Sequence, residues 1–284
     1  MKYLFLLPLG FILACNSPEV EEVQEAPIQE AEEYVEDDVY ELLWNFEDEF
    51  TDIQKDTLKL WITDVQIAVY YTLGDYPFDI NIFFHSSDSK GERPVSFAHT
   101  TRKKIREIHF YVKPDATYAA LMEDWTAQHE MSHLSAPFFG KPHKWISEGY
   151  ATYLSRRIMI DMGYFTEEEF EEMYTTKIAA TKEFYYDEVK PFSEVSADLF
   201  ESYNYGTVYW GSAGYWYTAD KKLQESHDMR LENLVKRYQS SGRLDDKNLE
   251  HVIKSFDEFT EDTIFRDLLD SYQNDPCCDV MKAF

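Results

Sequence analysis

The sequence predicts an α+β fold, in which a small mixed sheet precedes a long, largely helical C-terminal region. Apolar and polar residues alternate in two short segments of the first half, 78–84 and 105–112, as they do in half-buried strands. Beyond residue 114, apolar residues recur at helical spacing almost to the end of the chain. Because the strands precede the helices instead of alternating with them, we expect a small sheet lobe against a helical lobe, with a cleft between the two.

The first 15 residues have the pattern of a targeting segment. Lys2 is followed by a short, mostly apolar run that ends in Ile12-Leu13-Ala14-Cys15, too short for a membrane-spanning helix. These last four residues resemble the bacterial lipobox. The resemblance implies a signal peptide over residues 1–14, cleavage before Cys15 and lipidation of Cys15. An ordinary secretory signal with a chance cysteine is the alternative, and both interpretations predict a protein that works outside the cytoplasm.

An acidic segment follows, and we expect residues 15–39 to be a disordered tether. Residues 16–38 contain 10 Asp or Glu and no Lys or Arg, so they bury little apolar surface and repel one another. Acidic runs at this position resemble surface-export signals of some Gram-negative lipoproteins, although a solvated spacer explains them equally well. The expected location is the bacterial cell envelope, through a lipid anchor at Cys15, at the outer membrane or cell surface rather than the inner membrane.

The remaining residues, 40–284, contain no Gly/Ser or Pro linker and no repeat, and we expect one catalytic domain there. Residues 51–73 predict a helix with one apolar stripe, which ends at Gly74. Pro114-Asp115 opens a further helix with Asp115 as its N-cap, and Thr166 with Glu169 predicts a capping box. The other helices are expected at residues 144–159, 166–185, 207–224, 229–240, 247–255 and 260–273.

Composition excludes several classes of function. The chain has 54 acidic and 27 basic side chains, a net charge of −27, whereas nucleic-acid binding needs a basic face. Three cysteines are too few for a disulfide-stapled miniprotein or a four-cysteine zinc site. Cys277 and Cys278 are adjacent and poorly placed to bridge each other, so two free thiols or a link to another chain are both open. The acidity agrees with cationic substrates, and it agrees equally with solubility at a cell surface.

Residues 129–133 read His-Glu-Met-Ser-His. On a helix, positions four apart share one face, so His129 and His133 can bind a single metal ion. Glu130 lies about 100° around the same helix, where a base can take a proton from water at the metal.

Two imidazoles leave the site incomplete, because catalytic zinc has three protein ligands and one open position. Residues 145–153 read Trp-Ile-Ser-Glu-Gly-Tyr-Ala-Thr-Tyr and predict a second helix. Its small residues would let the two helices approach closely, so that Glu148 becomes the third ligand. One Zn²⁺ held by two imidazoles and a carboxylate is the pattern of zinc hydrolases.

Together these two motifs resemble the gluzincin metallopeptidases, and the Glu-Gly-Tyr-Ala-Thr-Tyr form is closer to the aminopeptidase branch than to thermolysin. The resemblance covers roughly residues 75–240. It implies a thermolysin- or aminopeptidase-like catalytic domain, zinc ligands His129, His133 and Glu148, and Glu130 as general base. The loop between the motifs is shorter than in the large aminopeptidases, and the segment that holds a substrate's free amine in that branch is missing, so endopeptidase and aminopeptidase activity both stay open.

The same resemblance implies a tyrosine that donates to the oxyanion, three residues before a glycine at the start of a helix. Tyr203 matches this position in Tyr203-Asn204-Tyr205-Gly206, and Tyr205 is the alternative. Residues 105–112 take the place of the edge strand that pairs with the substrate backbone in this family. His109 on that strand is expected to be a structural residue rather than a cleft residue, and His143 to cap or to face solvent.

The sequence therefore predicts a lipid-anchored zinc metallopeptidase whose partner is a peptide or protein substrate. Two other functions stay open. One is a surface binding or scaffold lipoprotein with a non-catalytic zinc site, and the other is a zinc hydrolase that acts on a non-peptide amide.

Overall fold

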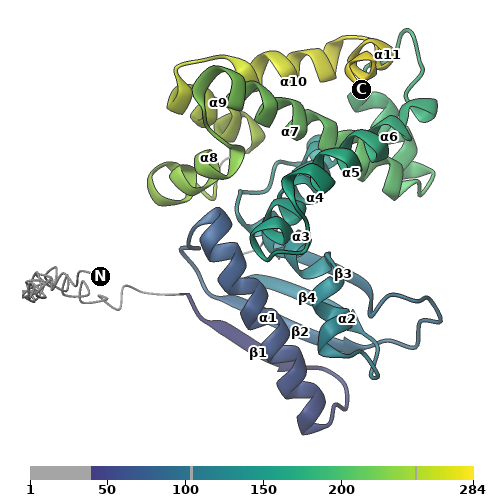
Figure 1. Cartoon of the computed structure of the whole chain (residues 1–284), viewed down its shortest axis with the longest axis vertical. Helices are drawn as coiled ribbons and strands as arrows, with labels where there is room; N and C mark the ends of the chain where they lie inside the picture. Colours follow the sequence, from purple (N-terminus) through teal and green to yellow (C-terminus); the bar gives the residue numbers. More distant parts are fainter. Residues whose placement is uncertain (1–39, 103–104, 247) are drawn as a thin grey trace, which may run out of the picture. The chain divides into compact units, whose positions relative to one another are not determined.

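A mixed four-stranded sheet of order β1-β2-β4-β3 forms the N-terminal part of the protein (Figure 1). The computed structural model describes residues 40–102, 105–246 and 248–284. The expected signal peptide, Cys15 and the acidic tether lie outside the described residues. Strands β1 (Leu42–Phe46) and β4 (Arg106–Val112) flank β2 (Ile80–Ser86) in parallel. Strand β3 (Val95–Arg102) pairs antiparallel with β4 and forms an edge of the sheet.

The two predicted strands are present as β2 and β4, but the expected role of residues 105–112 as an edge strand is wrong. Strand β4 lies between β2 and β3 and has neighbours on both sides. The edge belongs to β3, which the sequence did not predict because its side chains give no clear apolar face. Only Val95 is buried in this strand.

Helix α1 (Asp52–Leu73) lies across one face of the sheet (Figure 1). A capping box of Thr51 and Gln54 starts the helix, and the predicted stripe points inward. Its Trp61 ring packs edge-on against Phe110 of β4, with ring centroids 5.2 Å apart. The apolar spacing thus fixes which face of α1 covers the sheet.

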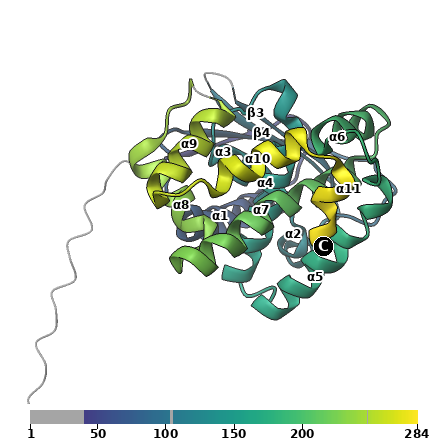
Figure 2. The ribbon, with the colours of Figure 1, turned by 90° about the horizontal axis from the view of Figure 1, so that it is seen from above.

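The rest of the described chain is mainly helical, as predicted. In Figures 1 and 2 the later helices gather around α4 and α7, which contact each other along their lengths. The α-helices are α2 (Tyr118–Glu123), α3 (Thr126–Leu134), α4 (Lys144–Asp161), α5 (Glu167–Ala179), α6 (Phe192–Glu201), α7 (Tyr205–His227), α8 (Leu231–Arg237), α9 (Leu249–Thr260), α10 (Ile264–Asn274) and α11 (Cys277–Val280).

Local signals placed these helix starts with mixed success. The capping box of Thr166 and Glu169 is confirmed at the start of α5. The expected N-cap at Asp115 is wrong, because Thr117 caps α2 by accepting a hydrogen bond from the Ala120 amide. Cys277 and Cys278 form no disulfide within the described part of the chain.

The described residues form a mixed α/β fold with a small sheet and a large helical part, in agreement with the predicted α+β class. No helix in these residues combines the length and apolar character needed to cross a bilayer.

Candidate metal centre

Helix α3 carries both predicted imidazoles, and the residues before it fix where it starts. Asp124 ends α2 and accepts hydrogen bonds from the Thr126 amide and from the Arg93 guanidinium. These bonds hold the break between α2 and α3. From this start, His129 and His133 lie one turn apart on the same face.

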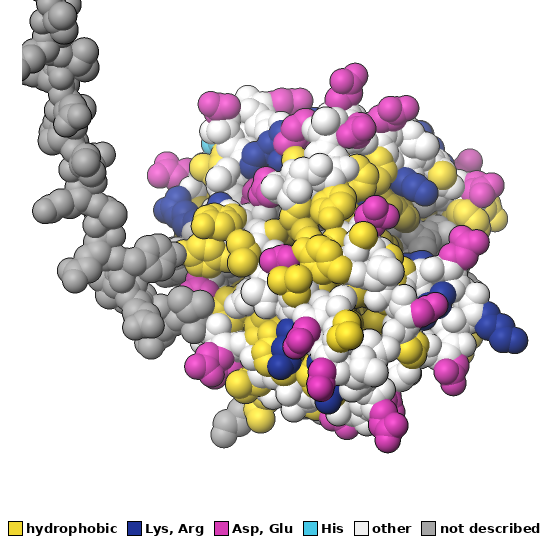
Figure 3. Space-filling model, turned by 60° about the horizontal axis from the view of Figure 1, so that its bottom comes forward, with side chains coloured by type: hydrophobic (Ala, Val, Ile, Leu, Met, Phe, Trp, Pro, Cys, Tyr) yellow, Lys and Arg dark blue, Asp and Glu magenta, His cyan; other side chains and the backbone are white. Residues whose placement is uncertain are grey.

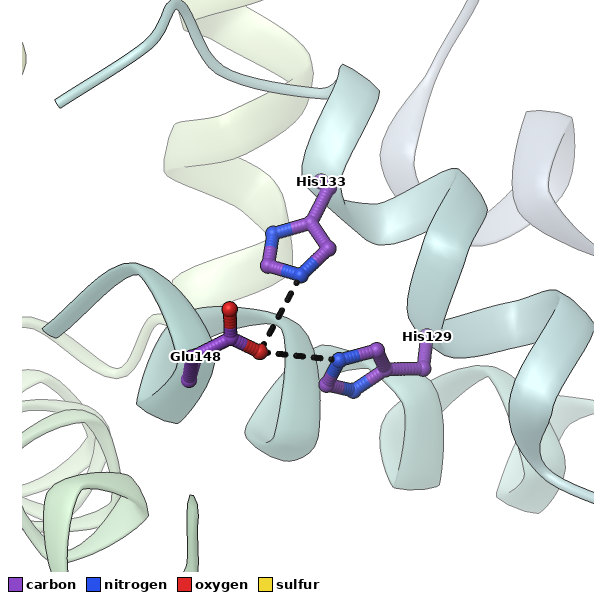
Figure 4. Close-up of side chains that lie close together, drawn as sticks. All are labelled: His129, His133 and Glu148. Atoms are coloured by element: carbon purple, nitrogen blue, oxygen red, sulfur yellow. Dashed lines mark hydrogen bonds and ion pairs between the residues drawn. The ribbon is translucent and has the colours of Figure 1, made fainter. Parts of the chain in front are cut away.

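Helix α4 supplies the carboxylate. Figure 4 shows the imidazoles of His129 and His133 directed at the same oxygen of Glu148. The His129 Nε2 atom lies 3.3 Å from Glu148 Oε2, and His133 Nε2 lies 3.4 Å from it. All three candidate ligand atoms lie within 4.8 Å of one another. The structure thus brings together all three predicted metal ligands.

The spacing of this group fits a metal ion. Two ligands at about 2.0 Å from one tetrahedral ion lie about 3.3 Å apart, close to both measured histidine–carboxylate distances. Two imidazoles and a carboxylate also suit a divalent transition metal. One feature departs from common metal sites, where the second imidazole nitrogen donates to a partner. The Nδ1 atoms of His129 and His133 are buried without a hydrogen-bond partner among the described residues.

Electrostatics prepare His133 and Glu148 as metal ligands. Burial lowers the pKa of His133 to about 4, which keeps its imidazole neutral at pH 7. Burial alone would raise the pKa of Glu148, but the neighbouring His133 and His129 hold it well below its usual range. Neutral imidazoles and an ionised carboxylate are the forms that bind metal ions.

Close approach of α7 to α4 depends on Gly149, the residue after Glu148. A Cβ atom at Gly149 would lie 2.4 Å from the Ser212 backbone carbon of α7. The sequence predicted that small residues here bring α4 close to the helix with the two imidazoles, whereas Gly149 faces α7 and allows that helix to approach. Trp216 of α7 donates to the Ile146 carbonyl of α4 at 2.9 Å and fixes this contact.

A cavity of about 780 Å³ opens over the three candidate ligands. One wall is the edge strand β3, and the others come from α3, the start of α4 and α7. Its lining residues are Phe97, Ala98, His99, Thr100, Thr101, Arg102, His129, Glu130, His133, Phe138, Lys141, Lys144, Ser147, Glu148 and Tyr209. The expected cleft is present, and it runs beside a sheet edge.

Glu130 lies in this cavity next to His129. Its Oε2 accepts a hydrogen bond of 2.8 Å from the Thr100 hydroxyl of β3, and the same hydroxyl lies 3.1 Å from the Glu130 carbonyl. Burial raises the pKa of the Glu130 carboxyl above its ordinary value. A carboxylate with a raised pKa accepts a proton more readily than a solvated one.

Tyr203, predicted as the oxyanion donor, does not line the cavity. It precedes α7, with a backbone φ of 60° and a side chain that is 78% exposed. Tyr205 lies closer, because the cavity residue Lys144 has its Nζ 5.7 Å from the Tyr205 ring centroid, yet Tyr205 is not a lining residue either. Helix α7 starts at Tyr205, so Tyr203 lies before the helix and Tyr205 is its first residue.

Tyr209 occupies the cavity instead. It lies one turn after Tyr205 on α7, and its ring centroid is 5.7 Å from that of His129. Burial, with the charges of Glu148 and Glu130, raises its pKa well above the ordinary value, so the hydroxyl stays protonated and can donate. Tyr209 lies four residues after Tyr205, and this spacing could have predicted it as a neighbour on the same helix face. The prediction requires the start of α7, which the sequence did not give.

Of the two other histidines considered from the sequence, His109 is a structural residue as expected, whereas His143 makes no side-chain capping hydrogen bond. His109 lies 3.0 Å from His85 through Nδ1 and Nε2, and it stacks on His99. It does not line the cavity, whereas His99 of the edge strand does. His143 directly precedes α4 and also stays outside the cavity lining.

Comparisons of the chain with protein-family models and with curated proteins gave no match. The family resemblance therefore rests on the two motifs, and the metal centre on the geometry of His129, His133 and Glu148.

Proposed function

We propose that this protein is a zinc-dependent peptidase with a gluzincin-like catalytic domain. The observation that carries the proposal is the convergence of His129, His133 and Glu148 at metal-ligand spacing, with Glu130 beside them in an open cavity. A purely structural metal site has no need of a buried carboxylate that stands next to its ligands without being one of them. When bound, zinc would polarise the scissile carbonyl and lower the pKa of a water molecule.

The chain's own residues would supply the proton transfers. Glu130 is ready to take a proton from the attacking water and to pass it to the leaving amine. Thr100, which donates to the Glu130 carboxylate, holds that carboxylate in place. Tyr209 replaces Tyr203 in the proposal as the hydroxyl that donates to the oxyanion, because it is the tyrosine that lines the cavity.

Strand β3 would bind the substrate backbone. Its inner side pairs with β4, and residues 97–102 line the cavity. An extended peptide added to this edge would gain main-chain hydrogen bonds without regard to its sequence. The substrate-pairing role proposed from the sequence thus moves from residues 105–112 to β3.

Location remains a proposal from sequence alone. The lipobox-like residues and Cys15 support export and a lipid anchor at the bacterial outer membrane or cell surface, with residues 15–39 as spacer. Under this proposal the catalytic domain meets peptides outside the cytoplasm.

The test is a peptide library incubated with residues 16–284 of the wild type and of Glu130→Gln, with products read by mass spectrometry. Glu172→Gln, an exposed change on α5, is the matched control. We expect cuts by the wild type and the control, and none by Glu130→Gln, which keeps its metal. The cut positions separate end trimming from internal cleavage. Equal cleavage by Glu130→Gln, or no cleavage by a zinc-loaded wild type, would reject the proposal.

A further inference from the structure

Arg102, the last residue of β3, lines the cavity and forms no ion pair with a carboxylate of the described residues. Its Nε atom is buried and has no hydrogen-bond partner among the described residues. Glu130 and Glu148 act on it through their charges, but neither forms an ion pair with it in the described part of the chain. An unpaired buried guanidinium is costly, so its position calls for an anion that is supplied by a ligand.

The carboxylates that line the cavity are already engaged. Glu148 faces both imidazoles, and Glu130 accepts from Thr100. Together their two negative charges would balance one divalent metal ion. Arg102 therefore remains as an excess positive charge beside the reaction site.

Two further cations stand at the entrance. Lys141 in the 3₁₀ turn before α4 and Lys144 at the start of α4 are exposed lining residues, and neither forms an ion pair with a described residue. The Lys144 ammonium is held 4.5 Å from the Phe200 ring centroid. An entrance with two ammonium groups that no described carboxylate neutralises favours anionic ligands over cationic ones.

This local charge is opposite to that of the molecule. Residues 39–284 contain 26 basic and 44 acidic side chains, so this part of the chain is strongly acidic. Figure 3 shows acidic side chains spread around one face of the protein. Three cations line this one cavity although the chain as a whole is strongly acidic, so the cavity is suited to an anionic ligand.

We propose that the cavity selects peptides with a carboxylate close to the scissile bond, and that Arg102 binds this carboxylate. The planar guanidinium matches a carboxylate through two parallel hydrogen bonds. A free C-terminus and an Asp or Glu side chain both offer this group. The inference rests on the proposed peptidase function and names its substrate class. Of the two explanations of the acidity that the sequence left open, it favours solubility over cationic substrates.

The test compares matched N-acetylated peptides. One pair differs only in a C-terminal acid against a C-terminal amide. A second set, amidated throughout, exchanges Asp for Asn or Glu for Gln at each position around the cut. We expect kcat/KM to be about tenfold to hundredfold higher for the carboxylate member in one of the two sets, and the set that responds identifies the source of the carboxylate.

Variants assign the preference to Arg102. In Arg102→Gln the ratio of kcat/KM between acid and neutral peptides should fall close to one, and Arg102→Lys should keep part of it. Lys254→Gln, an exposed charge change on α9, should keep the full ratio. Because the comparison within the wild type needs no variant, a misfolded Arg102→Gln does not block the test.

Binding separates this inference from the peptidase proposal. Calorimetric titration of the chelator-treated wild type with the peptide acid and its amide should give tighter binding of the acid, even if no peptide is cleaved. Cleavage with no preference for a carboxylate in either set, and equal binding of acid and amide, would overturn the role of Arg102 and leave the peptidase proposal standing. An undiminished preference in a folded Arg102→Gln would also overturn it.

Discussion

At the scale of single residues, the candidate site depends on three side chains that converge on one metal position and on two further side chains beside them. His129, His133 and Glu148 converge within 4.8 Å, and Glu130 and Tyr209 line the same cavity. The convergence needs only two histidines four residues apart on α3 and a second helix, α4, close enough for its carboxylate to reach them. For this reason the ligands and the carboxylate could be predicted from the sequence.

Tyr209→Phe tests the corrected position of the oxyanion donor. The change removes one hydroxyl and keeps the ring that packs near His129. We expect kcat to fall by about 10²- to 10³-fold with a small change in KM, measured on a peptide that the wild type cleaves. Tyr203→Phe, at an exposed position, is the matched control and should keep wild-type activity. The opposite pattern would return the role to Tyr203.

The tyrosine shows where sequence reasoning stops at this scale. Tyr203, Tyr205 and Tyr209 lie within seven residues, and only the start of α7 at Tyr205 decides which ring enters the cavity. A motif fixes spacing along the chain, whereas the direction of a side chain depends on the backbone. Arg102 was missed for a related reason, since β3 was not predicted at all.

At the scale of elements, long amphipathic helices were predictable and edge strands were not. The apolar stripe of α1 defines its buried face. Apolar residues at this spacing predict an amphipathic helix from the local sequence alone. Strands β1 and β3 have mainly half-buried residues and no clean alternation. Their pairing depends on partners distant in sequence, which no local pattern records.

Gly149→Ala tests whether the contact of α4 with α7 positions the site. The added methyl group would meet the Ser212 backbone, so α7, which carries Tyr209, must move away. We expect a loss of about 1–3 kcal/mol in the free energy of unfolding, measured by denaturant titration, and lower peptidase activity. Gly206→Ala on α7, where the added methyl group meets nothing within 4 Å, should change stability by less than about 1 kcal/mol. Equal effects of the two changes would contradict the account.

At the scale of the whole molecule, the buried site makes the stability of the metal-free protein depend on pH. Burial lowers the pKa of His133 from 6.5 to about 4. Between these values the unfolded chain binds a proton that the folded chain does not, so the free energy of unfolding falls as the pH falls. The depressed pKa of Glu148 adds a loss at still lower pH, and the raised pKa of Glu130 opposes the effect of His133 above pH 4.5.

His133→Gln should therefore flatten this dependence. We expect the free energy of unfolding of the chelated wild type to fall more steeply from pH 7 to pH 4.5 than that of His133→Gln, as measured by denaturant titration at each pH. Without His133 the pKa of the buried Glu148 also rises, and a carboxyl with a raised pKa stabilises the folded state as the pH falls, so this second effect flattens the dependence further. Identical slopes would mean that His133 is not buried as a neutral imidazole.

The central claim is that His129, His133 and Glu148 hold one zinc ion, and the most direct test is the zinc content of the purified protein. Mass spectrometry of the metal, after loading and dialysis, should find one zinc per chain in the wild type and in Glu130→Gln. The ion should be lost from His129→Gln, His133→Gln and Glu148→Gln that remain folded by circular dichroism. A wild type without zinc, or the same zinc content in all three ligand variants, would contradict the account.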